Sequence, residues 1–175
     1  VSNVSLAPSF YPIKYSPTNS FTPIGMVASV PLVLVANPSL SVQSLTQLQQ
    51  RVKQGPPLNY ASPGVGGPQH LAGVLLQKEL GSSFLHVPYK SGGAAMTAVV
   101  SGEVHFAFAG IPPAIGLIQS KKVVPILMTS LKRSSTLPDV PAASEVGLAG
   151  FQIDNWHALL APVNLPENVR TTLEG

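Results

Sequence analysis

Short apolar runs typical of β-strands alternate with helix-like runs through the middle of this chain, and that alternation limits the possible folds more than any other feature. The strand-like runs lie at residues 58–61, 84–88, 104–109 and 123–129. Helical patterns at residues 68–80, 94–101 and 112–119 separate them over short connections. This order predicts an α/β fold with a mainly parallel sheet, because parallel neighbours need a crossover between them.

Two longer extended runs bracket this α/β unit. The first covers residues 24–30 and 32–35, is rich in β-branched residues and is interrupted by Pro31. It is typical of a strand that bends as it passes from one sheet to another. The second covers residues 151–160. We expect both runs to cross between two lobes, and we expect the proline-containing residues 1–20 to form a loop.

Two helices can be described more closely. Ser44 is the predicted N-cap of a helix that carries Leu45, Leu48 and Val52 on one face and ends at Gly55-Pro56-Pro57. The helix that begins at Pro68 is expected to bury a stripe made of three aliphatic side chains. Those side chains are Leu71, Val74 and Leu75.

Composition excludes several classes of protein. The chain of 175 residues is 45% hydrophobic and only 10% charged, which argues against disorder. Its longest apolar run is interrupted at Ser29 and Pro31, far short of the ~20 residues of a membrane helix. The net charge of +3 reflects few acids, and the basic pairs are scattered, so no nucleic-acid partner is expected. The absence of cysteine excludes disulfides and Cys-ligated zinc, and no histidine pair has helical metal-site spacing, so we expect no cofactor or metal.

Glycine-bearing turns follow two successive predicted strands, and each turn opens a helix. The amides at a helix N-terminus attract anions, and glycine lets a ligand approach the backbone. A serine hydroxyl can also donate to a carboxylate. Such turns also occur for purely structural reasons, so both interpretations stay open. The candidate binding residues are Ser62, Gly64, Gly66 and Gly67 in the first turn, Lys90, Ser91, Gly92 and Gly93 in the second, and Gly110 after the next strand.

Other site types fit the sequence poorly. Pro68 and Gln69 stand where a phosphate-binding loop needs Lys-Ser/Thr, and Gln69 replaces the third glycine of a dinucleotide loop. The segment around Ser62 lacks the first glycine of a nucleophile elbow, so an enzyme is not expected. His70, in the first helical turn, either supports the loop or touches a ligand. His86 is interpreted as a packed or surface residue.

Six segments resemble the Bug (Bordetella uptake) family, the solute-binding proteins of tripartite tricarboxylate transporters. The matches follow one another in order from about Pro8 to Pro162. The segments are Phe21-Thr22-Pro23-Ile24-Gly25, Pro31-Leu32-Val33-Leu34-Val35, Leu58-Asn59-Tyr60-Ala61-Ser62, His70-Leu71-Ala72-Gly73, His86-Val87-Pro88-Tyr89-Lys90 and Leu137-Pro138-Asp139-Val140-Pro141.

The resemblance implies a type II periplasmic-binding-protein fold that closes on a small carboxylate, either a dicarboxylate, a tricarboxylate, an acidic amino acid or an aromatic acid. It also implies a periplasmic location, membrane permease subunits as partners and a monomer when full length. Residues 1–30 would be a first-lobe remnant with one crossing strand, residues 31–150 the complete second lobe, and residues 151–175 the returning strand. Residues 1–14 have no signal-peptide pattern, and we expect the chain to be a fragment lacking most of the first lobe.

Site residues follow from the same resemblance. Ser62, Gly64, Gly66 and Gly67 match the family loop that holds a ligand carboxylate, and His70 matches the histidine of that motif. Lys90, Ser91, Gly92 and Gly93 match a Tyr-Lys-Gly-Gly loop in which Ser91 replaces a glycine. Gly110 stands where members often carry a polar residue, and Ser2 and Asn3 stand where a Gly-Thr pair commonly lines the first-lobe side.

Two alternatives belong to other classes. An effector-binding domain of a transcription regulator can share this two-lobed fold. A carboxylate-processing enzyme would need a reactive side chain that the sequence does not reveal.

Overall fold

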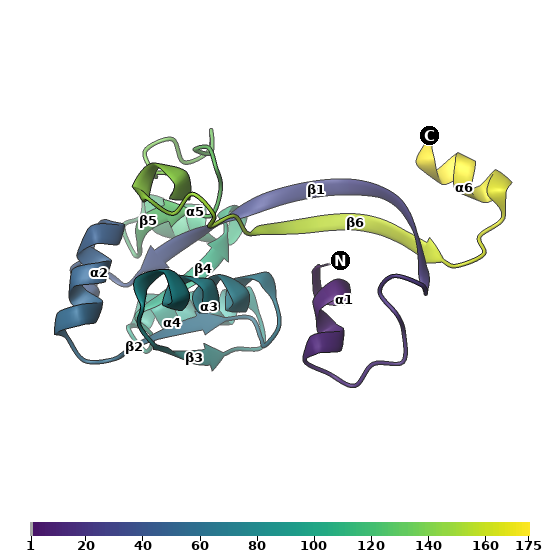
Figure 1. Ribbon diagram of the computed structural model, residues 1–175. Helices are drawn as coiled ribbons and strands as arrows, with labels where there is room; N and C mark the ends of the chain where they lie inside the picture. The colour runs from purple at the N-terminus through teal and green to yellow at the C-terminus, as the bar shows by residue number, and fades with distance from the viewer. Residues whose placement is uncertain (1) are drawn as a thin grey trace.

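The computed structural model describes residues 2–175, with side chains from Val4 onward. Its elements follow one another as α1 (Ser2–Leu6), η1 (Ala7–Ser9), β1 (Phe21–Ala36), η2 (Pro38–Leu40), α2 (Leu45–Gln54), β2 (Leu58–Ser62), α3 (Pro68–Leu80), β3 (Phe84–Pro88), α4 (Gly92–Ser101), β4 (Phe106–Gly110), α5 (Ile111–Gln119), β5 (Val124–Met128), η3 (Ala143–Val146), β6 (Asp154–Pro162) and α6 (Glu167–Glu174). An α/β lobe therefore carries a long two-stranded ribbon that reaches away from it (Figure 1).

The lobe is built on a sheet with the strand order β3-β2-β4-β1-β5. Strand β2 is parallel to β3 and β4, whereas β1 is antiparallel to both of its neighbours in the lobe, β4 and β5. Four strands thus share one direction, as a mainly parallel sheet requires. The sequence reasoning did not foresee the reversed strand β1 between them, because strand order depends on contacts between distant segments.

Strand β1 belongs to two sheets. It pairs with β6 from Phe21 to Pro31, and then with β4 and β5 from Leu32 to Ala36. The expected passage from one sheet to another is confirmed, but the strand continues through Pro31 without a break. Pro31 pairs opposite Asp154 at the last position of the ribbon, where a missing N–H costs least.

Helices cover both faces of the lobe sheet, and alternating side chains fill the two cores. In β4, Phe106 and Phe108 point to the core shared with α2 and α3, whereas Ala107 and Ala109 point to the core shared with α4 and α5. This follows from the two-residue period of a strand. Large side chains therefore fill the first core and small ones allow α4 and α5 to approach closely.

Helix α2 matches its prediction. The Ser44 hydroxyl accepts from the Gln47 N–H, and Gly55 ends the helix. Leu45 and Leu48 are buried, and Val52 on the same face is partly buried against the core. The predicted stripe of α3 is wrong, since Val74 and Leu75 are exposed and the helix buries Ala72, Gly73, Leu76 and Leu80. The Tyr60 ring lies where a side chain at Gly73 would be, so the face of α3 that packs on the sheet is the one that contains this glycine.

The amino-terminal segment also differs from the prediction. Residues 1–20 were expected to form a loop, but the structure has the short helices α1 and η1 there. Pro8 does not prevent this, because it lies in the first turn of η1, where an N–H is not needed. Within residues 2–175 the structure has no helix with the length and apolar character that crossing a membrane requires.

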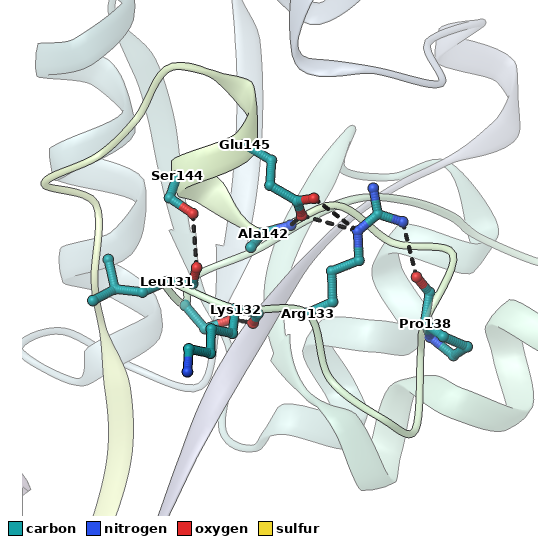
Figure 2. A network of polar contacts seen from close by, with 8 residues as sticks. Leu131, Lys132, Arg133, Pro138, Ala142, Ser144 and Glu145 are labelled. Atoms are coloured by element: carbon teal, nitrogen blue, oxygen red, sulfur yellow. Dashed lines mark hydrogen bonds and ion pairs between the residues drawn. The ribbon is translucent and has the colours of Figure 1, made fainter.

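The long connection after β5 is held by one exposed arginine (Figure 2). The Arg133 Nε donates to both carboxylate oxygens of Glu145, at 3.0 and 2.9 Å, and its Nη1 donates to the Pro138 carbonyl at 2.9 Å. The Ala142 N–H also donates to Glu145. That N–H and the guanidinium hold the pKa of Glu145 below its ordinary value. The segment around Pro138 that resembles the family is thus a fixed loop.

Candidate functional site

Three helices begin at one edge of the lobe sheet. Because β2, β3 and β4 run in the same direction, their carboxyl ends meet at this edge. Helices α3, α4 and α5 each start within a few residues of these strand ends. The amino ends of helices carry unpaired N–H groups and a partial positive charge. Helix α5 supplies fewer N–H groups than α3 and α4, because its second and third residues are Pro112 and Pro113. The topology therefore concentrates anion-attracting groups at this edge, as α/β sheets commonly do at ligand sites.

A cleft of about 610 Å³ opens beside the first of these helices. One wall is the turn between β2 and α3, and the other walls come from the amino-terminal segment and from the ribbon strand β6. None of the lining residues is acidic. They are Ala7, Tyr11, Pro63, Gly64, Val65, Gly66, Gly67, Pro68, Gln69, Asn155 and His157.

Two glycines of this turn have backbone conformations that other residues rarely adopt. Gly64 has φ = 143° and Gly66 has φ = 82°. A side chain at Gly66 would also approach the Phe10 ring, with its Cβ 2.7 Å from Cδ2. The Tyr11 hydroxyl donates to the Val65 carbonyl at 3.2 Å. The turn is therefore held closely against the amino-terminal segment, and glycine is required for its shape.

The amides of the turn fall into two groups. The N–H groups of Gly64 and Gly66 donate to side chains within the protein. Those of Val65 and Gly67 make no hydrogen bond of ordinary geometry among residues 2–175, although the turn over Val65 and Gly66 brings the Gly67 N–H toward the Gly64 carbonyl. Helix geometry leaves the Gln69 and His70 N–H groups without intrahelical acceptors. Four amides at the start of α3 are thus available, and an anion is the ligand that such a group of donors suits.

Ser62 is buried and its hydroxyl is already engaged. It donates to the Gly64 carbonyl at 2.8 Å, accepts from the Gly64 N–H at 3.1 Å, and lies 2.7 Å from Nε2 of His86. The residue is not among those that line the cleft. In this structure Ser62 stabilises the turn, and its predicted contact with a ligand stays a prediction.

His70 lies behind the turn, where its Nδ1 accepts from the Gly66 N–H at 3.1 Å. The supporting role that we considered for it is therefore visible in the structure. Burial lowers the pKa of His70. Burial and the neighbouring His70 lower the pKa of His86 to about 4. Both rings are therefore neutral at neutral pH.

The second glycine-bearing turn is built differently. The Ser91 hydroxyl caps α4 by accepting from the Ala94 N–H at 3.2 Å, and Ser91 has an extended backbone with φ = −159°. Neither Gly92 nor Gly93 has a positive φ. Gly92 and Gly110 line a cavity of about 50 Å³ that shares Pro63 and Gln69 with the larger cleft. Lys90, Ser91 and Gly93 line neither space.

Ser2 and Asn3 belong to α1, but their side chains lie outside the described part of the chain. The same segment contributes Ala7 and Tyr11 to the cleft. No cluster of three or more metal-binding side chains occurs within residues 2–175.

Sequence reasoning missed several residues around the cleft. Asn155 and His157 line it from β6, and His86 supports the turn from behind. The two-residue period of an extended strand could have placed Asn155 and His157 on one face. Tyr11 gave no signal, because residues 1–20 have no periodic pattern.

An α/β lobe joined to a crossing ribbon, with a cleft at the helix starts, is the architecture of a two-lobed solute-binding protein. The whole chain, residues 1–175, matches the TctC family model, described as the tripartite tricarboxylate transporter family receptor. The chain belongs to this family, which confirms the resemblance found in the sequence.

Solved structures agree with this assignment. The periplasmic binding protein BugD is 35% identical with a TM-score of 0.87, over 98% of this chain and 58% of BugD. MatC from Rhodopseudomonas palustris, solved with bound malate, is 30% identical with a TM-score of 0.85, over 98% of this chain and 58% of MatC. Rpa4515 from R. palustris, solved with adipate, is 29% identical with a TM-score of 0.85, over 93% of this chain and 55% of Rpa4515. The chain spans about half the length of the curated relatives it matches.

Proposed function

We propose that this chain forms the carboxylate-binding lobe of a periplasmic receptor that delivers a small dicarboxylate or related acid to a tripartite transporter. The observation that carries this proposal is the group of free amides at the start of α3, because three of these residues, Val65, Gly67 and Gln69, line a cleft without acidic residues. Backbone amides bind a carboxylate without needing a basic side chain. The malate and adipate bound by relatives are dicarboxylates, the class of ligand proposed for this chain.

The cleft also indicates how the ligand would be oriented. One carboxylate would lie on the amides of Val65, Gly67 and Gln69. The rest of the molecule would extend toward β6, where Asn155 and His157 offer hydrogen-bonding groups. A ligand with polar groups at both ends suits such a cleft better than a simple fatty acid does.

The segments of the chain would have different roles in binding. Residues 31–150 would move as one lobe, while residues 1–30 and 151–175 would belong to the ribbon and to the opposite lobe. The ligand would bring the lobes together by contacting both, which is the usual domain closure of binding proteins. The closed, monomeric receptor would then meet membrane permease subunits, without any nucleic-acid partner.

Isothermal titration of the full-length receptor tests this function. The panel should contain malate, succinate, adipate, citrate and benzoate, with dimethyl succinate as a matched neutral control. We expect at least one acid to bind and the dimethyl ester to give no heat, because esterification removes the charge that the amides recognise. A receptor that ignores every acid on the panel, or that binds the ester equally well, would contradict the proposal.

A further inference from the structure

Two histidines from different elements meet behind the turn between β2 and α3. His70 comes from the first turn of α3 and His86 from the middle of β3. Their ring centroids are 4.2 Å apart with an interplanar angle of 30°. Neither lines the cleft. The pair therefore contacts the turn without lining the cleft.

Each histidine anchors one end of the turn. At one end, His70 Nδ1 accepts from the Gly66 N–H. At the other, His86 Nε2 lies 2.7 Å from the Ser62 hydroxyl, which holds Gly64 by both its N–H and its carbonyl. Both glycines with positive φ are thus fixed, directly or through Ser62, by this pair.

The hydrogen bonds determine where the protons lie. Ser62 has a single hydroxyl proton, so when the hydroxyl donates to the Gly64 carbonyl, His86 Nε2 donates to the hydroxyl oxygen. His70 Nδ1 accepts from an N–H and therefore carries no proton. A second proton on His70 would place two donors face to face. The bond from the Gly66 N–H therefore requires Nδ1 of His70 to be unprotonated, and burial favours the neutral form of His86 as well.

The surroundings favour the neutral forms. The Tyr60 ring lies 4.9 Å from the His86 ring, and the Tyr60 hydroxyl donates to the His70 carbonyl at 3.2 Å. The Phe10 ring meets the edge of His70. Burial raises the pKa of Tyr60 to about 12, so this neighbour is uncharged. No hydrogen bond or ion pair joins either histidine to an acidic or basic side chain within residues 4–175.

We propose that His86 is a positioning residue for ligand binding, which acts through Ser62 and, with His70, holds the turn in the conformation that presents its free amides. This rests on the proposed function of the turn. His86 never touches the ligand. Its contribution is to remove the alternative backbone conformations that Gly64 and Gly66 would otherwise populate, so that binding does not have to order the turn.

The same contacts argue against a catalytic Ser–His pair. Ser62 is completely buried, and its hydroxyl lies 2.8 Å from the Gly64 carbonyl, which competes with the imidazole for the single hydroxyl proton. No carboxylate orients His86 among the contacts of residues 4–175. The pair therefore supports a backbone conformation and does not activate a nucleophile.

Titration of the full-length receptor with malate and the other acids of the panel tests this role, using the acid that binds best. His86→Phe keeps a ring against Tyr60 and His70 but loses the N–H, and we expect affinity to fall about tenfold, the usual effect of one hydrogen bond. His86→Gln keeps an amide donor that can reach the Ser62 oxygen, and should restore affinity to within about threefold of wild type. His105→Phe removes another half-buried histidine, bonded to Asn59, and should lower stability without changing affinity.

A double-mutant cycle makes the test independent of packing. Ser62→Ala should weaken binding as His86→Phe does, and the double variant should lose no more than either alone, because both remove the same link. If the wild type binds an acid and His86→Phe binds it equally well, or if the two losses simply add, the inference is wrong. If the wild type binds no acid, the proposed function itself fails.

Discussion

The two glycine-bearing turns at the edge of the lobe sheet look alike in the sequence but differ in the structure. The turn after β2 contains Gly64 and Gly66 with positive φ, lines the cleft and is supported by two histidines. The turn after β3 has no glycine with positive φ and is closed by the Ser91 cap. Glycine is required for the backbone of the first turn, whereas the second turn uses an ordinary helix start.

This difference shows that glycines in similar sequences can have two different roles, one required by the backbone conformation and one not. A glycine with φ near 80° cannot be replaced cheaply, because a Cβ there collides with the following carbonyl oxygen. A glycine in the first turn of a helix can be replaced freely when nothing lies near it. Gly93 belongs to the second kind, since the only neighbour that a Cβ there would meet is the Ser91 hydroxyl, at 3.9 Å.

The two turns should therefore differ most in how a glycine-to-alanine substitution changes the free energy of unfolding. Gly66→Ala combines an unfavourable φ with a contact to Phe10, and we expect it to lower the free energy of unfolding by about 1 to 3 kcal/mol. The matched variant Gly93→Ala should raise that free energy by about 0.5 kcal/mol, because alanine favours helix. Urea unfolding measures both. Equal losses in the two variants would mean that both turns impose the same backbone.

Acid should weaken the first turn in particular. The pKa of His86 is about 4 in the folded protein, below the ordinary 6.5, so the unfolded chain takes up this proton first as pH falls. The stability that the neutral ring contributes is therefore lost between about pH 6.5 and 4, with no further loss from this group below that. We expect the free energy of unfolding to fall by about 1 to 2 kcal/mol over this range, a value reduced because solvent screens a half-buried ring.

Unfolding by urea across this pH range, in the wild type and in His86→Gln, isolates that contribution. His70 and His105 also have lowered pKa values and act in the same direction in both proteins. The wild type should therefore lose more stability than the variant. Parallel pH profiles would show that His86 is not held neutral by the fold.

The smallest effect should come from the cap of the second turn. Ser91→Ala removes the acceptor for the Ala94 N–H and should cost about 1 kcal/mol or less, the usual range for an N-cap at an exposed position. Ser91→Asp restores an acceptor at the helix start and should recover the lost free energy of unfolding. A loss in Ser91→Ala larger than that in Gly66→Ala would reverse our ranking of the two turns.

The sequence predicted well whatever depends on local pattern. The α/β class, the Ser44 cap, the passage of β1 between two sheets and the glycine turn after β2 all follow from residues close together in the chain. Features that depend on distant contacts were not predictable. The reversed direction of β1 and the contact of Gly73 in α3 with Tyr60 are set by partners that no local pattern reveals.

The site was predictable to the same extent. Gly64, Gly66 and Gly67 were identified from their spacing and line the cleft, whereas Lys90, Ser91 and Gly93 were identified from a similar spacing and do not. His86 looked like a packed strand residue, because its partner Ser62 lies 24 positions away. Only the parallel pairing of β2 with β3 brings the two together.

The most direct test of the account is to follow backbone amide resonances of the ¹⁵N-labelled full-length receptor while malate, or the best-binding acid, is added. If a ligand carboxylate lies on the first turn, the largest shifts should occur at Val65, Gly67, Gln69 and His70, with smaller changes at Gly92 and Gly93. Large shifts at Gly92 and Gly93 with none at residues 65–70 would contradict it, because the carboxylate would then lie on the second turn.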